Sequence, residues 1–124
     1  MAENNDIGKK GEKMAYRYLE EQGYDILETN WHLGHLEVDI IAAKDGILVF
    51  AEVKTRRSDE FGAPEDFVDK RKQKAYVKIA NNYIVTNNRS DEARFDIIAI
   101  ISDGQQFSIR HIPNAFTVID ALYR

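Results

Sequence analysis

The chain has 124 residues and a formal net charge of −4, with 44% hydrophobic and 31% charged residues, which is the balance of one globular domain over residues 1–124. It has no cysteine, which excludes disulfides, thiolate metal sites and cysteine nucleophiles, so a metal ion must bind oxygen or imidazole. No apolar run approaches the ~20 residues that span a bilayer and no secretory pattern opens the chain, so we expect a cytoplasmic protein without a membrane partner.

The first predicted element is a helix over residues 6–22. Asn5 or Asp6 suits its N-cap, and Gly23 suits its end. Three strands are predicted next, over residues 24–30, 36–43 and 47–55. The Asp45-Gly46 pair between the second and third strands is typical of a two-residue hairpin turn.

A long helix is predicted from Pro64 to about Val85, because proline suits the first turn of a helix. A strand pair over residues 94–101 and 106–112 follows, and a short helix after Pro113 ends the order. An antiparallel meander followed by a helical crossover to a further strand predicts an α/β fold, in which helices flank a mixed β-sheet.

Charged side chains lie inside the second and third predicted strands, although both strands look buried on both faces. Alternation places Asp39 on the opposite face from Val38 and Ile40, and it places Glu52 and Lys54 together on one face. Buried charges are costly unless they are paired or bind a metal ion. These strands are therefore the first place to look for a functional site.

The hairpin register sharpens this expectation. A two-residue turn at 45–46 predicts that Asp39 lies opposite Glu52 and that Glu37 lies opposite Lys54. Opposed side chains have Cβ atoms ~5 Å apart, so two carboxylates there repel each other unless a divalent cation lies between them or one is protonated.

Asp39 and Glu52, with the carbonyl of Val53, are candidate ligands of Mg²⁺, with Mn²⁺ as the second candidate, because such ions take one or two carboxylates together with water and phosphate oxygens. Lys54 is a candidate to activate water and to offset charge on a phosphate transition state. The alternative is a buried salt-bridge network of the same residues with Glu37, and the local pattern leaves both open.

Each helix adds one candidate. Lys72 lies on the stripe that faces the sheet, where the carboxylates or a bound phosphate would serve as its partner, or it extends from the stripe's edge into solvent. Gly8 and Gly11 predict a close approach of the first helix to the sheet or to a phosphate backbone. Glu12 beside them is a further candidate ligand, unless it only interacts with the helix dipole.

Eight of the seventeen basic residues lie between Lys54 and Lys78, which is the pattern of a phosphate-binding face or of a solvated basic helix. Outside this segment we expect a packing role for Trp31, a structural role for His111, and an ion pair between Arg94 and Asp96.

Asp39, twelve intervening residues and then Glu52-Val53-Lys54 resemble the PD-(D/E)xK nuclease signature, without its proline before Asp39. Over residues 8–101 the chain resembles the YraN-like uncharacterised protein family 0102, which is related to archaeal Holliday-junction resolvases. The motifs that carry this resemblance are Gly8-x-x-Gly11-Glu12-x-x-Ala15, Leu36-Glu37-Val38-Asp39-Ile40-Ile41-Ala42, Phe50-Ala51-Glu52-Val53-Lys54-Thr55-Arg56, Arg71-Lys72-Gln73 and Arg94-Phe95-Asp96.

The resemblance implies a restriction-endonuclease-like fold with a nuclease-like active site, but it implies no established substrate. Our leading hypothesis is a metal-dependent nuclease that acts on DNA in preference to RNA, with branched DNA as a candidate substrate by analogy with the resolvases. A homodimer would match the two-fold symmetry of a junction. The residues implied at the active site are Glu12, Asp39, Glu52 and Lys54, those expected to bind substrate are Arg56, Arg57, Lys72 and Gln73, and Glu37 is a supporting residue. The alternatives are a nucleic-acid-binding module that does not cut and a structural protein with a buried ion network.

Overall fold

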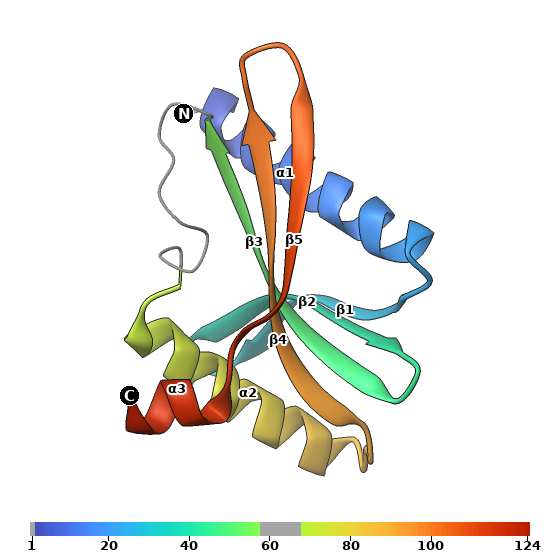
Figure 1. Cartoon of the computed structure of the whole chain (residues 1–124), viewed down its shortest axis with the longest axis vertical. Coiled ribbons are helices and arrows are strands. Elements are labelled where there is room, and N and C mark those ends of the chain that lie inside the picture. Colours follow the sequence, from blue (N-terminus) through green and yellow to red (C-terminus); the bar gives the residue numbers. More distant parts are fainter. Residues whose placement is uncertain (1, 58–67) are drawn as a thin grey trace.

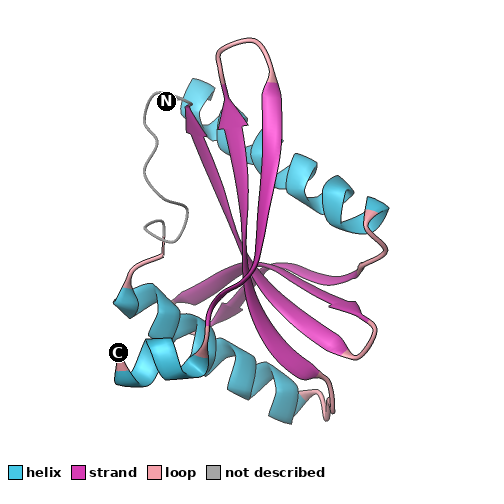
Figure 2. Cartoon of the chain, viewed as in Figure 1, coloured by secondary structure: helices cyan, strands magenta, loops and turns pink. Residues whose placement is uncertain are grey.

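The computed structural model describes residues 2–57 and 68–124, with the side chains of α1 described from Gly8 onward. The elements appear in chain order in Figures 1 and 2. They are α1 (Ala2–Glu21), β1 (Asp25–Leu33), β2 (Leu36–Lys44), β3 (Ile47–Arg57), α2 (Lys70–Thr86), β4 (Glu92–Ser102), β5 (Phe107–Phe116) and α3 (Val118–Tyr123). Within the described residues, no helix is both long and apolar enough to cross a membrane.

The strands form one sheet in the order β1-β2-β3-β4-β5. Neighbouring strands are antiparallel except β3 and β4, which are parallel. The chain passes from β3 through α2 before it enters β4. Two parallel strands need such a long crossover connection, because the chain has to return to the starting edge of β3 before β4 can run in the same direction. The predicted α/β fold, a mixed sheet flanked by helices, is confirmed.

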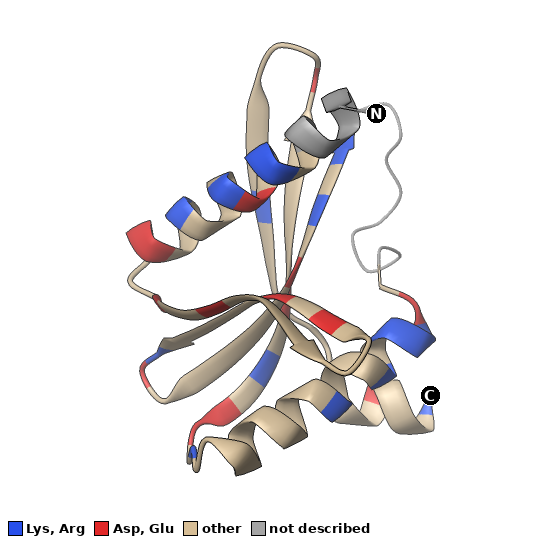
Figure 3. Cartoon of the chain, turned by 180° about the vertical axis from the view of Figure 1, so that it is seen from behind, with Lys and Arg blue, Asp and Glu red and all other residues tan. Residues whose placement is uncertain are grey.

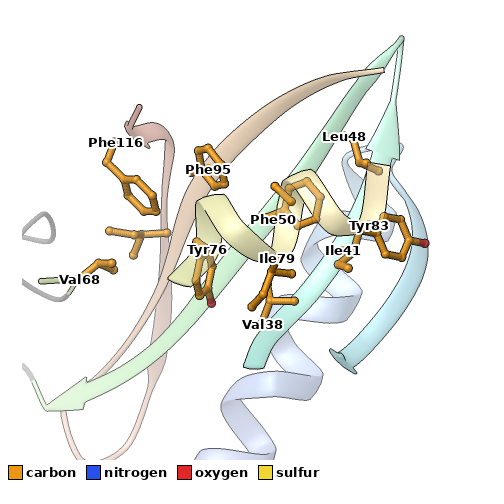
Figure 4. Packing of buried hydrophobic residues seen from close by; sticks show 12 residues of the cluster. Val38, Ile41, Leu48, Phe50, Val68, Tyr76, Ile79, Tyr83, Phe95 and Phe116 are labelled. Carbon is orange, nitrogen blue, oxygen red and sulfur yellow. The ribbon is translucent and has the colours of Figure 1, made fainter. Parts of the chain in front are cut away.

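Helices cover both faces of the sheet: α1 packs on one face, and α2 with α3 packs on the other (Figure 1). On the α1 face, Ala15 and Leu19 pack against strand residues such as Val49 and Ile98. On the α2 face, the core contains Val38, Ile41, Leu48, Phe50, Val68, Tyr76, Ile79, Tyr83, Phe95 and Phe116 (Figure 4). Alternating apolar residues on β3 serve both cores, as predicted for a strand that is covered on both sides.

The ends of the helices differ from the prediction. α1 begins at Ala2 and not at residue 6, so neither Asn5 nor Asp6 is its N-cap, whereas Gly23 ends it with a φ of 92° as expected. α2 begins at Lys70, because the side chain of Asp69 accepts a hydrogen bond from the backbone N–H of Lys72 at 2.9 Å and caps the helix there. Pro64 lies outside the described residues.

The strands are longer than predicted. β1 continues through Trp31 to Leu33, so the connection to β2 is a tight turn at Gly34, whose φ is 62°. β5 continues past Pro113 to Phe116. Proline has no backbone N–H to donate, and β5 tolerates it because an edge strand has no neighbouring strand on one side that would need this donor. The Asp45-Gly46 turn has positive φ at both residues (51° and 78°), as the predicted hairpin requires.

Strict alternation fails in the middle of β2. Val38 packs in the core on the α2 face, whereas Ile40, two residues later, packs in the core on the α1 face. Asn30, on the neighbouring strand β1 between the residues paired with Ile40 and Val38, has a φ of 50°. The sheet is therefore locally distorted beside Asp39, and this carboxylate borders hollows on both sides of the sheet.

Candidate functional site

Glu52 is the centre of the site. It lies on β3 with 2% of its surface exposed, and both carboxylate oxygens are engaged. Lys72 from α2 donates to Oε2 at 2.7 Å, and the Nζ of Lys54 lies 3.2 Å from the same oxygen. The lysine predicted on the sheet-facing stripe of α2 therefore finds its anionic partner in the strand.

The hydroxyl of Tyr76 donates to Oε1 of Glu52 at 2.6 Å, a contact that sequence reasoning did not anticipate. Burial raises the pKa of Glu52, but the hydrogen bonds from Lys72 and Tyr76 and the charges of Lys72 and Lys54 outweigh it and lower this pKa below the ordinary value. Tyr76 follows Lys72 by one helical turn, which was the available signal. Glu52 is consequently held ionised and in one orientation.

Asp39 approaches Glu52 differently from the predicted register. The β2–β3 ladder runs from Lys44–Ile47 to Ile40–Ala51 as expected and ends there, so Asp39 and Glu52 are not partners in it. Beyond the ladder, the Oδ2 of Asp39 accepts a hydrogen bond from the backbone N–H of Val53 at 2.8 Å. The side chain of Asp39 thus accepts the β3 backbone hydrogen bond that a backbone carbonyl of β2 would accept if the ladder continued.

The two carboxylates still affect each other. The pKa of Asp39 is raised to about 7, mainly by burial and then by the charge of the Glu52 carboxylate, while the hydrogen bond from Val53 acts in the opposite direction. Glu12 adds a smaller repulsion. Near neutral pH Asp39 is therefore partly protonated beside an ionised Glu52, and a nearby cation would favour its ionised form.

Glu12 reaches this region because α1 lies very close to the sheet. A Cβ added at Gly11 would overlap the hydroxyl oxygen of Thr55 and would lie 3.6 Å from Ile100, so the expected close approach is present at Gly11. At Gly8 nothing lies within 4 Å of such a Cβ, so Gly8 makes no close approach to the sheet, and contact of Gly8 with a phosphate backbone stays a prediction.

Three hollows meet at these carboxylates. Glu12 and Asp39 both line a cavity of about 320 Å³ beside α1. Asp39 and Glu52 line a second one of about 470 Å³ beside the start of α2, and Glu12 and Lys54 line a third of about 840 Å³ near the end of β3. A substrate can therefore reach the charged residues from several directions.

The other predicted residues lie farther out. Glu37 pairs with His32 across β1 and β2 at 2.7 Å and not with Lys54, so the predicted Glu37–Lys54 pair is wrong, although Glu37 lines the hollow beside α2. Arg56 and Arg57 line the large hollow at the end of β3.

Gln73 donates to the carbonyl of Val68 at 3.1 Å, and its Oε1 is buried without a partner among the described residues. This amide therefore supports the start of α2. Trp31 packs edge-on against Tyr83, with the ring centroids 5.4 Å apart, as its expected packing role requires.

The oxygen atoms of the site supply part of the coordination shell that a hard cation such as Mg²⁺ requires. The buried Glu52 and the half-buried Asp39 match the one or two carboxylates that Mg²⁺ takes from a protein. Because the N–H and C=O of one strand residue point to the same side, the carbonyl of Val53 is directed like its N–H, toward β2 and Asp39. Residues 8–57 and 68–124 bring together no group of three His, Asp or Glu side chains at metal-binding spacing. Water and substrate oxygens would have to complete the shell.

A second buried charged group lies on the α1 face, around Asp96, which is fully buried. Arg94 donates to both of its oxygens at 2.9 and 2.8 Å, His111 contacts it at 2.7 Å, and the backbone N–H of Asn114 donates at 3.0 Å. Burial raises the pKa of Asp96, but these contacts outweigh it and lower the pKa. The expected Arg94–Asp96 pair is confirmed.

The charged side chains of the sheet and their partners form two clusters. The Glu52 cluster comprises Glu12, Asp39, Glu52, Lys54, Lys72 and Tyr76. The Asp96 cluster comprises Tyr18, Tyr24, Arg94, Asp96 and His111, because the Tyr24 hydroxyl accepts from Arg94 at 2.7 Å and the Tyr18 hydroxyl lies 3.0 Å from Nδ1 of His111.

Comparison with known proteins identifies the family of this chain. The model of the uncharacterised protein family UPF0102 matches residues 11–100, which include the whole Glu52 cluster. A UPF0102 protein of Flavobacterium psychrophilum is 49% identical over 116 residues, covering 94% of this chain and 98% of the relative. One of Bacteroides thetaiotaomicron is 47% identical over 116 residues, covering 94% and 96%. With the match extending from α1 through β4 and the relatives aligned over nearly their full length, the chain belongs to family UPF0102.

Proposed function

We propose that this protein is a divalent-metal-dependent nuclease that hydrolyses phosphodiester bonds in DNA, with branched DNA as a candidate substrate. The observation that carries the proposal is the closeness of two carboxylates from neighbouring strands, the half-buried Asp39 and the buried Glu52, with two lysines at one oxygen of Glu52. Phosphodiester hydrolysis needs a site for a cation and nearby positive charge for the phosphate.

Mg²⁺ or Mn²⁺ fits between Asp39 and Glu52 on electrostatic grounds, because the repulsion that raises the pKa of Asp39 would be relieved there. The carbonyl of Val53 is a further donor. When bound, such an ion lowers the pKa of a coordinated water and polarises a phosphoryl oxygen.

The residues of the chain have separate roles in this proposal. Hydrogen bonds from Tyr76 and Lys72 fix the carboxylate of Glu52 in one orientation. It therefore does not have to reorient when the reaction takes place. Lys54 retains 23% of its side-chain surface exposed and can contact a phosphate oxygen or the attacking water. Glu12 borders the hollow from the α1 side, where it can orient water.

Lys72 and the arginines at the end of β3 supply phosphate contacts. Lys72 is 40% exposed at its side chain, so it can contact Glu52 and a substrate from the same position. Burial lowers its pKa, but Glu52 more than compensates and raises it, which keeps the ammonium charged. Arg56 and Arg57 extend the positive charge along the large hollow.

DNA rather than RNA, and branched rather than linear DNA, follow from the similarity of this family to Holliday-junction resolvases. A homodimer would present two such sites to the two-fold symmetry of a junction. Both choices rest on analogy between folds, so single strands and duplexes have to be tested beside branched DNA.

A second candidate function is a nucleic-acid-binding module that keeps the fold without cutting. The observation that favours it is that both oxygens of Glu52 are already satisfied by Lys54, Lys72 and Tyr76. A carboxylate that is neutralised by two lysines needs no metal ion, and the lysines could bind phosphate by themselves.

The test is cleavage of labelled single strands, duplexes, flaps and four-way junctions with Mg²⁺, Mn²⁺ or EDTA. Asp39→Asn and Lys54→Ala should each reduce metal-dependent cutting by about a hundredfold or more, since each removes an electrostatic contribution to the transition state. Matched controls are Asp25→Asn on β1 and Lys78→Ala on α2, which are exposed and lie outside the Glu52 cluster.

Equal cutting by wild type and Asp39→Asn would contradict the site assignment. Salt-dependent binding of the same DNAs without any metal-dependent cutting would favour the binding module. The substrate that is cut fastest would decide between branched and linear DNA.

A further inference from the structure

The hollow of about 320 Å³ beside α1 has a composition that phosphodiester hydrolysis alone does not explain. One wall is the α1 side that carries Lys9, Lys13, Tyr16 and Arg17, the opposite wall is β1, and Asp39 of the Glu52 cluster lies at its inner end. Its volume lies within the range of small-ligand pockets.

The α1 wall carries three cations at four-residue spacing, Lys9, Lys13 and Arg17, which places one on each successive turn, ~6 Å apart. Figure 3 shows basic residues following one another along this helix. Within residues 8–57 and 68–124, no ion pair joins any of the three to a carboxylate. A row of cations without acidic partners, on a chain of net charge −4, is suited to a polyanion.

Tyr16 lies in the same wall and is 37% exposed. It follows Glu12 by one helical turn, so its ring is beside the carboxylate that faces Asp39. An exposed aromatic ring next to cations is the combination on which unpaired bases stack in single-strand binding sites.

The β1 wall supplies Thr29 and Asn30, both exposed, whose hydroxyl and amide groups can donate and accept hydrogen bonds at a base edge. Asn30 is the residue whose φ of 50° accompanies the distortion beside Asp39. The wall that can contact a base and the carboxylate that would bind a metal ion are therefore adjacent.

We propose that this hollow binds one unpaired nucleotide, with its base against Tyr16 and the strand's phosphates along Lys9, Lys13 and Arg17, so that the neighbouring phosphodiester lies at Asp39. The inference rests on the proposed function and names its substrate class: a strand with an unpaired nucleotide next to the bond that is cut, as in single strands, flaps and junction arms. A paired base can enter only after unstacking, which costs a few kcal/mol.

The test is binding measured by fluorescence anisotropy in metal-free buffer, with all variants made in an Asp39→Asn background to prevent cutting. The probes are a labelled oligothymidine and a labelled hairpin duplex. Tyr16→Ala should weaken binding of the single strand by about tenfold and leave the duplex unchanged, whereas Tyr16→Phe should retain both affinities because the ring remains. Tyr123→Ala, at an exposed tyrosine of α3, is the matched control.

Lys13→Gln should weaken binding to the single strand and reduce the salt dependence by about one phosphate contact, whereas Lys78→Gln on α2 should do neither. Equal effects of Tyr16→Ala and Tyr123→Ala on the single strand would overturn the inference. So would an equal loss of single-strand and duplex affinity in Tyr16→Ala, and so would the absence of binding to any strand.

Cleavage separates this inference from the proposed function. If the protein with Asp39 restored cuts DNA and Tyr16→Ala leaves the ratio of flap to duplex cutting unchanged, the nuclease stands and the inference fails. If nothing is cut but binding of the single strand still depends on the ring of Tyr16, the inference stands as a binding site and the nuclease fails. If flap cutting alone falls in Tyr16→Ala, both stand.

Discussion

Glu52 and Asp96 lie on opposite faces of one sheet, and their clusters accommodate buried charge in opposite ways. Asp96 is a single carboxylate whose two oxygens receive Arg94, His111 and a backbone N–H. The Glu52 cluster has three carboxylates but two lysines, and both lysines contact Glu52. Asp39 is left with a backbone N–H and a raised pKa.

This difference is the one expected between a structural group and the proposed reactive one. A buried charge that is fully paired contributes to a unique fold and has no capacity left for a ligand. A carboxylate such as Asp39, which lies near a second carboxylate and has no cation of its own, costs stability, and a bound cation would relieve this cost. The pKa of Asp96 is lowered and that of Asp39 is raised to about 7, although both lie in strands of the same sheet.

The largest expected effect is loss of the Asp96 charge. Asp96→Asn leaves the guanidinium of Arg94 half-buried without a counter-charge, so the free energy of unfolding should fall by about 3 kcal/mol. Urea denaturation at pH 7 measures it. Asp91→Asn, which breaks the more exposed Arg89–Asp91 pair, is the control and should change the midpoint far less. Equal effects of the two substitutions would mean that the buried Arg94–Asp96 pair matters no more for stability than the more exposed Arg89–Asp91 pair.

The same substitution at Asp39 should have the opposite sign. In metal-free buffer at pH 8, Asp39→Asn removes a carboxylate whose ionisation is opposed by burial and by Glu52, and it should stabilise the protein by about 2 kcal/mol. Thermal or urea unfolding at pH 8 provides the measurement. Destabilisation at pH 8 would show that Asp39 is paired as well as Asp96 is.

The two clusters should also respond oppositely to pH. The pKa of Asp39 is raised when folded, so its contribution to stability is complete below its unfolded pKa and is lost as pH rises from about 4 through 7. The pKa of Asp96 is lowered, so its contribution is present above about 4 and is lost as pH falls further. Mg²⁺ should restore stability at pH 8 in wild type and have no such effect in Asp39→Asn.

Tyrosine-to-phenylalanine substitutions sharpen the comparison on a smaller scale. Tyr76→Phe removes a hydrogen bond to the ionised Glu52 in a fully buried position and should cost about 1.5 kcal/mol. The fold should persist, because the ring remains packed in the α2-face core. A cost close to zero would mean that Lys72 and Lys54 satisfy Glu52 without the hydroxyl.

Tyr18→Phe, which removes the contact of the Tyr18 hydroxyl with Nδ1 of His111 in a partly buried position, should have the smallest effect, about 1 kcal/mol or less. Urea denaturation of both variants in parallel gives the difference. A larger cost for Tyr18 than for Tyr76 would mean that the Asp96 cluster depends on its outer tyrosine more than the Glu52 cluster depends on its inner one.

Local pattern was sufficient for the elements and for part of the site. Turn chemistry at Asp45-Gly46 predicted the hairpin, and alternation on β3 correctly predicted that Glu52 and Lys54 lie together on one face of the strand. Element ends were less predictable: α2 begins where Asp69 caps it, and β5 runs past Pro113 because it is an edge strand. Such ends depend on a competing cap or on a missing neighbour, which a periodic pattern does not contain.

By itself, the sequence determined the order of the elements, the mixed sheet, the burial of Glu52 in a central strand and the family, since periodicity, turn residues and motif spacing are local properties. Of the other carboxylates predicted to be buried, Asp39 is half-buried and Glu37 is exposed. Tertiary structure alone decided which partner each charge takes: Tyr76 for Glu52, the Val53 N–H for Asp39, His32 for Glu37 and His111 for Asp96. Those choices depend on where the ladder ends, how far the sheet twists and how closely the helices approach, and each of these results from packing across the whole chain.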